Sequence, residues 1–207
     1  MRGEADPLWS RLADAVVEHG YAVEPGFLAP EAVRELALAL RKREAGGRFH
    51  DAGIGGRQAE LVRPMLRGDR ICWLEAAETP AEVTLVAALD ALRVGLNRAL
   101  MLGLGELELQ YASYAAGRHY VRHRDLSPRG IERVVSLALY LNEGWTAGDG
   151  GELVIATADG EVVVSPTGGT LVVFLSERFE HEVRAAGRER LSLSGWFSRR
   201  AMEVAGR

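Results

Sequence analysis

The stretch Tyr120–Asp125, which reads YVRHRD, decides how the rest of the chain is interpreted. His123 and Asp125 are two residues apart, and in an extended strand or at its exit such residues point to the same side. An imidazole and a carboxylate can therefore converge on one point. His181, on a later predicted strand, would add a second imidazole. The three residues together predict a metal site made of two histidines and one carboxylate.

This ligand set is typical of non-haem Fe(II), because three protein ligands leave three positions of an octahedral ion open. A His-x-Asp pair alone is a weak signal, since it is more often an ordinary hydrogen-bonded pair. The downstream residues Arg190 and Trp196 strengthen it. His119 is a rival ligand four residues before His123, but the residues between them favour a strand and include no Glu, which argues against a helical zinc motif. We expect His119 at the rim of the site.

Composition and charge narrow the possible classes. The chain has 207 residues, of which 47% are hydrophobic and 26% charged, and this suits one globular unit with a real core. A net charge of −4 gives no reason to expect nucleic acid or an anionic membrane as a partner. We find no apolar signal core and no apolar run of membrane-spanning length. A single cysteine, Cys72, excludes an internal disulfide and favours the cytoplasm. The protein is expected to be a monomer.

Helices are predicted to dominate the first half of the chain. One is expected from Pro7, with Asp6 as its N-cap, and a second from Pro30. A third is expected after Thr79, which forms a capping-box pattern with Glu82. Its buried stripe is expected to comprise Val83, Val86, Leu89, Leu92 and Leu96. Short strands are expected at 21–23 and 71–74.

Two segments of the first half are interpreted as exposed. The basic run Arg41–Arg43 is predicted to be the solvated last turn of the second helix, where the helix dipole favours cations. Residues 45–65, rich in Gly and Arg, are either a surface loop or a mobile flap near the site.

From Glu106 onward the apolar period changes to two, which indicates strands. Gly- and Pro-containing turns separate several of the runs. The fold class predicted is α+β, with a double-stranded β-helix (jelly-roll) core at 106–207 and an N-terminal helical support with edge strands at 1–105, packed on the core as one structural unit. The predicted strands are 106–111, 119–123, 133–141, 152–156, 161–164, 170–175, 181–185 and 190–197.

Arg190 is the second residue on which the interpretation depends. The strands 181–185 and 190–197 are predicted to form an antiparallel hairpin that places Arg190 below His181 on the same face. A buried guanidinium needs an anion. Without an acidic partner in the protein, a carboxylate ligand is the natural counterion, because a guanidinium binds it through two hydrogen bonds. The hydroxyl of Tyr140 would help to hold the same carboxylate.

Taken together, these segments resemble the Fe(II)/2-oxoglutarate-dependent dioxygenases. Within them the chain is most similar to the prolyl hydroxylase-domain group, the bacterial relatives of the oxygen-sensing protein prolyl hydroxylases. The resemblance runs from about Gly20 to Ser198. The segments that carry it are Leu66–Trp73, Tyr120–Asp125, Leu139–Trp145, Gly150–Leu153, and His181 through Arg190 to Trp196.

By this resemblance His123, Asp125 and His181 bind Fe(II) and form the catalytic centre. Arg190 is expected to form a salt bridge with the distal carboxylate of 2-oxoglutarate, and Tyr140 to donate a hydrogen bond to it.

Six further residues receive roles from the same resemblance. Tyr114 is expected near the metal-bound end of the cosubstrate, although its spacing to the iron histidine is one residue shorter here than in the family. Ser136 and Ser194 are expected to line the cosubstrate pocket. The residues expected to contact the substrate are Arg133, Trp196 and Asp69.

The implied reaction is the hydroxylation of a prolyl residue in a loop of a protein substrate. It would consume O₂ and 2-oxoglutarate, release succinate and CO₂, and be supported by ascorbate. The presence of Asp125 favours hydroxylation over halogenation, because related halogenases lack that carboxylate. Two alternatives stay open: an oxygenase that acts on free proline or another small molecule, and a β-barrel module that binds a metal or ligand without turnover.

Overall fold

The computed structural model describes residues 7–54, 61–125 and 131–200. Three helices and thirteen strands are assigned within these ranges, together with a short 3-10 helix, η1 (Ala147–Asp149). The expected N-cap Asp6 lies outside them. No helix in the described ranges is both long and apolar enough to cross a membrane.

The helices begin where their proline and capping signals predict. They are α1 (Pro7–His19), α2 (Pro30–Ala45) and α3 (Pro80–Leu100). At the start of α3, Thr79 and Glu82 exchange side-chain and backbone hydrogen bonds, so the predicted capping box is confirmed. The predicted buried stripe is partly wrong, because Val83 is 57% exposed whereas Leu85 is buried. Leu85, Leu89, Leu92 and Leu96 form one continuous row, and Val83 falls beside it.

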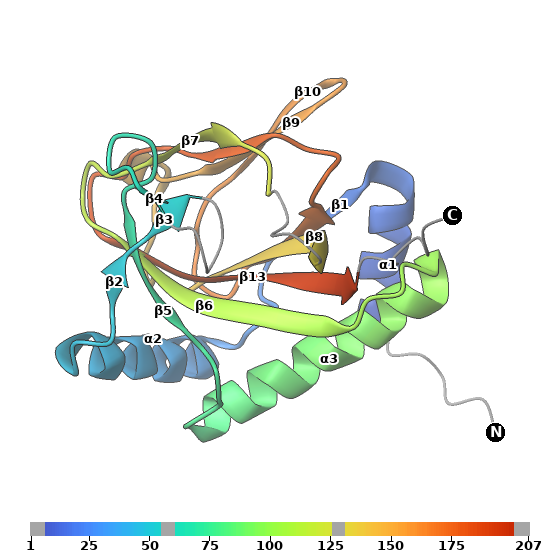
Figure 1. Cartoon of the computed structure of the whole chain (residues 1–207), viewed down its shortest axis with the longest axis horizontal. Helices are drawn as coiled ribbons and strands as arrows, with labels where there is room; N and C mark the ends of the chain where they lie inside the picture. Colours follow the sequence, from blue (N-terminus) through green and yellow to red (C-terminus); the bar gives the residue numbers. More distant parts are fainter. Residues whose placement is uncertain (1–6, 55–60, 126–130, 201–207) are drawn as a thin grey trace, which may run out of the picture.

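Two antiparallel sheets face each other and form the β core (Figure 1). This architecture is a double-stranded β-helix, as the alternating pattern from Glu106 predicts. The larger sheet has the strand order β1 (Tyr21–Glu24), β11 (Leu171–Leu175), β8 (Ile131–Tyr140), β13 (Arg190–Arg200), β6 (Glu106–Tyr114), β5 (Asp69–Trp73) and β2 (His50–Asp51). The smaller has the order β10 (Gly160–Val164), β9 (Leu153–Thr157), β12 (His181–Val183) and β7 (Tyr120–His123).

The larger sheet is buried on both faces. Helices α2 and α3 cover one face, and the four-stranded sheet lies over the other (Figure 1). Along β8 the odd-numbered Val135, Leu137 and Leu139 belong to the cluster shared with the helices. The even-numbered Ser136 and Tyr140 point to the other side, as the strand period requires. Polar groups of the larger sheet are thereby directed between the two sheets.

The predicted hairpin between His181 and Arg190 is wrong. Strand β12 belongs to the four-stranded sheet and β13 to the seven-stranded sheet. The connection between them is held by a bridge of Ala186 to Gly150 and by a hydrogen bond from Gly117 to the Ala186 carbonyl. The chain therefore changes sheets after His181, and the two side chains line one cavity from opposite walls.

The solvated basic turn predicted at Arg41–Arg43 is also partly wrong. Arg43 is only 3% exposed, and its Nη1 lies 2.5 Å from Oε1 of Glu82. The same carboxylate oxygen accepts a 2.7 Å hydrogen bond from the hydroxyl of Tyr111. A buried guanidinium is tolerated here because α3 supplies a buried counterion.

The surface-loop interpretation of residues 45–65 holds only in part. Strand β2 extends the larger sheet, and β3 (Gly53–Ile54) pairs with β4 (Leu61–Val62). Phe49 and Ala52 are buried. Residues 55–60, at the centre of the expected flap, lie outside the described ranges.

Candidate functional site

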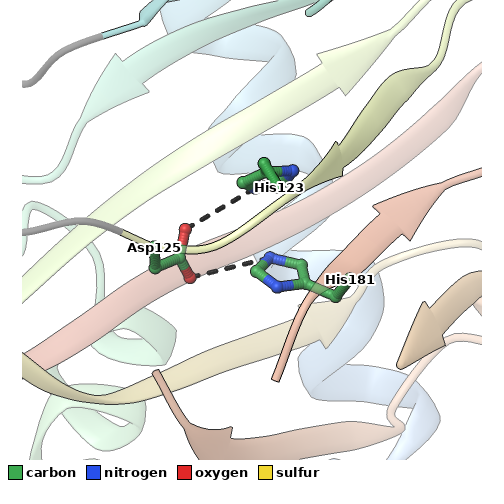
Figure 2. Close-up of side chains that lie close together, drawn as sticks. All are labelled: His123, Asp125 and His181. Atoms are coloured by element: carbon green, nitrogen blue, oxygen red, sulfur yellow. Dashed lines mark ion pairs between the residues drawn. The ribbon is translucent and has the colours of Figure 1, made fainter. Parts of the chain in front are cut away.

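Three side chains converge at the edge of the four-stranded sheet. His123 and His181 are opposite each other in the antiparallel pair β7 and β12, and Asp125 follows β7 by two residues. Nε2 of His123 lies 3.7 Å from Oδ1 of Asp125, and Nε2 of His181 lies 3.7 Å from Oδ2. Figure 2 shows the three side chains pointing toward one another. One ligand atom from each residue can be chosen so that all lie within 4.8 Å of one another.

The environment keeps His181 and Asp125 in the forms that bind a cation. Burial lowers the pKa of His181 to about 4, so the imidazole is neutral at neutral pH. Burial alone would raise the pKa of Asp125, but His181, His123 and the Ser136 hydroxyl outweigh it and hold that pKa below its ordinary value. Neutral imidazoles and an ionised carboxylate are the protonation states that metal binding requires.

The ring of His123 is fixed from two sides. Its Nδ1 lies 2.8 Å from the carbonyl oxygen of Val121, which leaves Nε2 facing Asp125 and His181. The phenol of Tyr120 stacks on the imidazole with ring centroids 3.5 Å apart and an angle of 16° between the planes. The predicted ligands thus arrive pre-oriented, and the donor set fits a divalent ion such as Fe(II).

Sequence reasoning missed the support behind that stack. The guanidinium carbon of Arg67 lies 5.0 Å from the Tyr120 ring centroid, and its Nε donates a 2.8 Å hydrogen bond to Asp69. The signal was present in the sequence, because Arg67 and Tyr120 lie in two of the segments that carry the family resemblance. His119 does not join the group of His123, Asp125 and His181 that can hold a metal.

A cavity of about 620 Å³ extends from this centre between the two sheets. Every second residue of β13 lines it from Arg190 to Trp196. Neighbouring strands add side chains in register, with Tyr114 opposite Arg190 and Ser136 opposite Trp196. Tyr140 is opposite Ser192 and is buried beside the guanidinium of Arg190. The wall of the larger sheet is therefore a ladder of polar and aromatic groups facing the two histidines.

The side chain of Arg190 has the features expected of a receptor for an anion. Arg190 is 3% exposed; its Nε donates to the Gly151 carbonyl at 2.9 Å and its Nη1 to the Ser192 hydroxyl at 3.3 Å. No carboxylate pairs with it among the described residues. The Tyr140 hydroxyl is buried without a hydrogen-bond partner in the same ranges. Burial raises the pKa of Tyr140 to about 12, so the phenol keeps its proton. A guanidinium and a phenol in these states fit a carboxylate ligand.

Tyr114 shares this end of the cavity. The Arg190 guanidinium carbon lies 5.2 Å from its ring centroid. Burial raises the pKa of Tyr114 well above its ordinary value, so this phenol also stays protonated.

The two serines expected along the cavity have different partners. Ser136 donates a 2.6 Å hydrogen bond to Oδ2 of Asp125, so it contacts the metal-ligand carboxylate. Ser194 accepts a 3.1 Å hydrogen bond from Nε2 of Gln110, another buried cavity residue that sequence reasoning did not identify.

The three residues expected to contact substrate all line the cavity. The guanidinium of Arg133 lies over the Trp196 ring, with its carbon 3.6 Å from the centroid, and its Nε lies 3.2 Å from Glu108. Trp73 lies beside Trp196, with ring centroids 6.2 Å apart. The carboxylate of Asp69 is engaged by Arg67 through two hydrogen bonds of 2.8 and 3.1 Å.

Comparisons with known proteins agree with this geometry. The family model of the 2OG-Fe(II) oxygenase superfamily matches residues 109–198, which include the two histidines, Asp125 and Arg190. A Pseudomonas putida prolyl-4-hydroxylase is 44% identical and superimposes with a TM-score of 0.86, covering 93% of this chain and 100% of that one.

Two further relatives extend the similarity to animals. Prolyl hydroxylase EGLN3 of Homo sapiens is 28% identical over 192 residues, covering 87% of this chain and 79% of the relative. A prolyl hydroxylase from Trichoplax adhaerens, solved with a peptide fragment of hypoxia inducible factor, shares the fold with a TM-score of 0.83 at 24% identity, covering 92% of this chain and 88% of that one. The chain belongs to the 2OG-Fe(II) oxygenase superfamily and is a prolyl hydroxylase-like, 2-oxoglutarate-dependent dioxygenase.

Proposed function

We propose that this protein hydroxylates a prolyl residue in a protein substrate, with conversion of 2-oxoglutarate to succinate and CO₂. The observation that carries the proposal is one cavity that joins the His123–Asp125–His181 cluster to the Arg190 receptor. A ferrous ion bound at the cluster would supply the oxidising chemistry, in which O₂ is used to decarboxylate the keto acid and hydroxylate the substrate. The protein supplies ligands, orientation and exclusion of water.

Each end of the cavity has a role in the proposal. Arg190 and Tyr140 hold the distal carboxylate of 2-oxoglutarate, with Tyr114 beside them. Arg133 and Trp196 contact the substrate near Asp125, because Trp196 lies opposite Ser136, which bonds that carboxylate. Asp69 acts through Arg67 rather than by direct contact, since two hydrogen bonds occupy its carboxylate.

The similarity to enzymes named prolyl hydroxylases supports proline as the target. The supporting segment 1–105 contributes Asp69 and Trp73 to the cavity of the core 106–207, and we infer that the two work as one structural unit. We also infer that ascorbate maintains activity and that the enzyme acts as a cytoplasmic monomer.

The direct test is turnover with Fe(II), ascorbate, O₂ and 2-oxoglutarate. Succinate release would be measured with a mixture of cell proteins, with free proline and with neither. Peptide mapping would search for the gain of one oxygen atom on proline. Succinate that rises with proteins, together with oxygenated prolyl peptides, is the expected result. The matched control is His123→Ala, checked for folding by circular dichroism.

The same assay distinguishes the alternatives. Stimulation by free proline, with no modified peptides, would assign a small-molecule substrate instead. Absence of succinate in every arm, from protein that is folded and metal-loaded, would leave only a binding module.

A further inference from the structure

A chain of two buried serines holds the carboxylate of Asp125 from behind. Ser136 on β8 lies 2.6 Å from Oδ2 of Asp125, and its hydroxyl lies 2.8 Å from the hydroxyl of Ser176. Ser136 is 2% exposed and Ser176 is fully buried. Ser176 directly follows β11, and its backbone N–H donates to the Val134 carbonyl at 3.0 Å, which anchors it beside β8.

The direction of these hydrogen bonds follows from the number of protons available. A carboxylate that binds a metal is ionised and can only accept, so Ser136 gives its single hydroxyl proton to Oδ2. The oxygen of Ser136 is then the acceptor for the hydroxyl proton of Ser176. The relay runs one way, from Ser176 to Ser136 to Asp125. Because both serines are buried, water does not compete with it.

The hydrogen bonds from Ser176 through Ser136 reach only one of the two carboxylate oxygens of Asp125. Each oxygen lies 3.7 Å from one histidine Nε2, Oδ1 from that of His123 and Oδ2 from that of His181, but Ser136 donates its hydrogen bond to Oδ2. A carboxylate without such a partner can bind a metal through one oxygen or through both. Binding through both would use a fourth position on the ion and leave less room for a chelating keto acid.

We propose that Ser136, backed by Ser176, is a positioning residue that occupies Oδ2 and presents Asp125 to the metal through Oδ1 alone. The relay thereby keeps positions on the ion open for 2-oxoglutarate. The inference rests on the metal site of the proposed function but does not depend on the identity of the substrate.

The test measures two dissociation constants without any turnover. Mn(II) binding to metal-free protein is followed by the electron paramagnetic resonance of free Mn(II). Binding of 2-oxoglutarate to the Mn(II)-loaded protein is followed by calorimetry. The variants are Ser136→Ala, Ser136→Thr and Ser113→Ala. Ser113 is a matched control, because it is a buried serine of the same sheet that bonds Glu189 and does not line the cavity.

For Ser136→Ala we expect the 2-oxoglutarate dissociation constant to rise about tenfold or more. Ser136→Thr retains the hydroxyl and should lie within about threefold of the unmodified protein, as should Ser113→Ala. An unchanged 2-oxoglutarate constant in folded Ser136→Ala overturns the proposal, whether or not Mn(II) binding has weakened.

A second variant keeps the test decisive if Ser136→Ala does not fold. Ser176→Ala leaves the 2.6 Å bond from Ser136 to Asp125 in place but removes the hydroxyl that donates to Ser136, so a smaller rise in the same constant is expected. No rise there also overturns the proposal. If the unmodified protein failed to bind Mn(II), the metal site itself would be refuted. If it bound Mn(II) but did not hydroxylate proline, both dissociation constants could still be measured and would still test the role of Ser136.

Discussion

The guanidinium of Arg190 lies against the ring of Tyr140, with its carbon 5.0 Å from the ring centroid. Both side chains are buried, and within the described ranges the structure offers no acidic partner to Arg190. The energetic cost of an unpaired buried cation is high unless a ligand supplies the anion. The buried pair is therefore suited to bind a carboxylate group of a ligand, and the proposed ligand is the diacid 2-oxoglutarate.

Arg190→Met should weaken 2-oxoglutarate binding. Loss of one partner of a buried charge pair costs about 2 kcal/mol or more, which is roughly a 30-fold rise in the dissociation constant. Calorimetry on Mn(II)-loaded protein measures the constant. Arg184→Met is the control, because Arg184 is exposed and lies 3.4 Å from Glu161, which is also exposed. Equal affinities for the two variants would contradict the assignment of Arg190.

Metal binding should stabilise the fold through His181. An ion at about 100 times its dissociation constant adds about 2.7 kcal/mol to the free energy of unfolding. Mn(II) should therefore raise the melting temperature of the metal-free protein, and a chelator should reverse the rise. His181→Ala should abolish the shift, whereas His50→Ala, at an exposed position, should retain it. A full shift in His181→Ala would show that the ion binds elsewhere.

Arg133→Gln should weaken the interaction with the prolyl substrate and leave the interaction with 2-oxoglutarate nearly unchanged. The substitution removes the cation stacked on Trp196, at a position away from the Arg190 rung. We expect KM for the prolyl substrate to rise about fivefold or more, since such stacks contribute about 1 kcal/mol or more when desolvated. KM for 2-oxoglutarate should change by less than about twofold. A rise confined to the 2-oxoglutarate KM would reverse the assignment of the two ends.

The sequence was most informative where one local pattern decided the structure. The period-two run from Glu106 predicted β6, and the spacing of His123 and Asp125 predicted their convergence. The two-residue strands β2, β3 and β4 are too short to show a period. The transfer of the chain between sheets after His181 depends on the bridge between Ala186 and Gly150, which no local pattern encodes.

The burial of Arg43 is likewise not predictable from the local sequence. Its basic neighbours and its place in the last turn of α2 predict exposure, and only the approach of Glu82 from another helix reverses that. The Ser136–Asp125 bond is a further case, because it joins two segments whose contact depends on how the two sheets face each other.

Arg43→Met should destabilise the fold without touching the cavity. It leaves the fully buried Glu82 carboxylate without its cation, which costs about 3–5 kcal/mol of unfolding free energy. Urea unfolding measures the loss. Arg41→Met is the control, because Arg41 is more exposed and its ion pairs with Glu44 and Glu189 should contribute less than about 1 kcal/mol. Similar losses in the two variants would contradict the special role of the buried pair.

The same variant should change the dependence of stability on acid. Burial alone would raise the pKa of Glu82, but the backbone N–H of Glu78, the Tyr111 hydroxyl and Arg43 together lower it. A lowered carboxyl pKa contributes stability that is fully present above the ordinary value of 4.5 and is lost as pH falls through the folded-state value. Unfolding free energy should therefore fall less steeply below about pH 4.5 in Arg43→Met.

Gly195→Ala should loosen the central strand of the larger sheet. A methyl group on Gly195 would meet the carbonyl oxygen of Glu108 well inside van der Waals contact, so β13 would have to shift away from β6. We expect a loss of about 1–3 kcal/mol by urea unfolding, together with weaker 2-oxoglutarate binding, because Arg190 is carried by the same strand. In the control Gly105→Ala, the nearest atom lies 3.6 Å from the added carbon, which is ordinary contact. A fully stable Gly195→Ala protein with unchanged 2-oxoglutarate affinity would show that β13 tolerates displacement and does not set the position of the receptor.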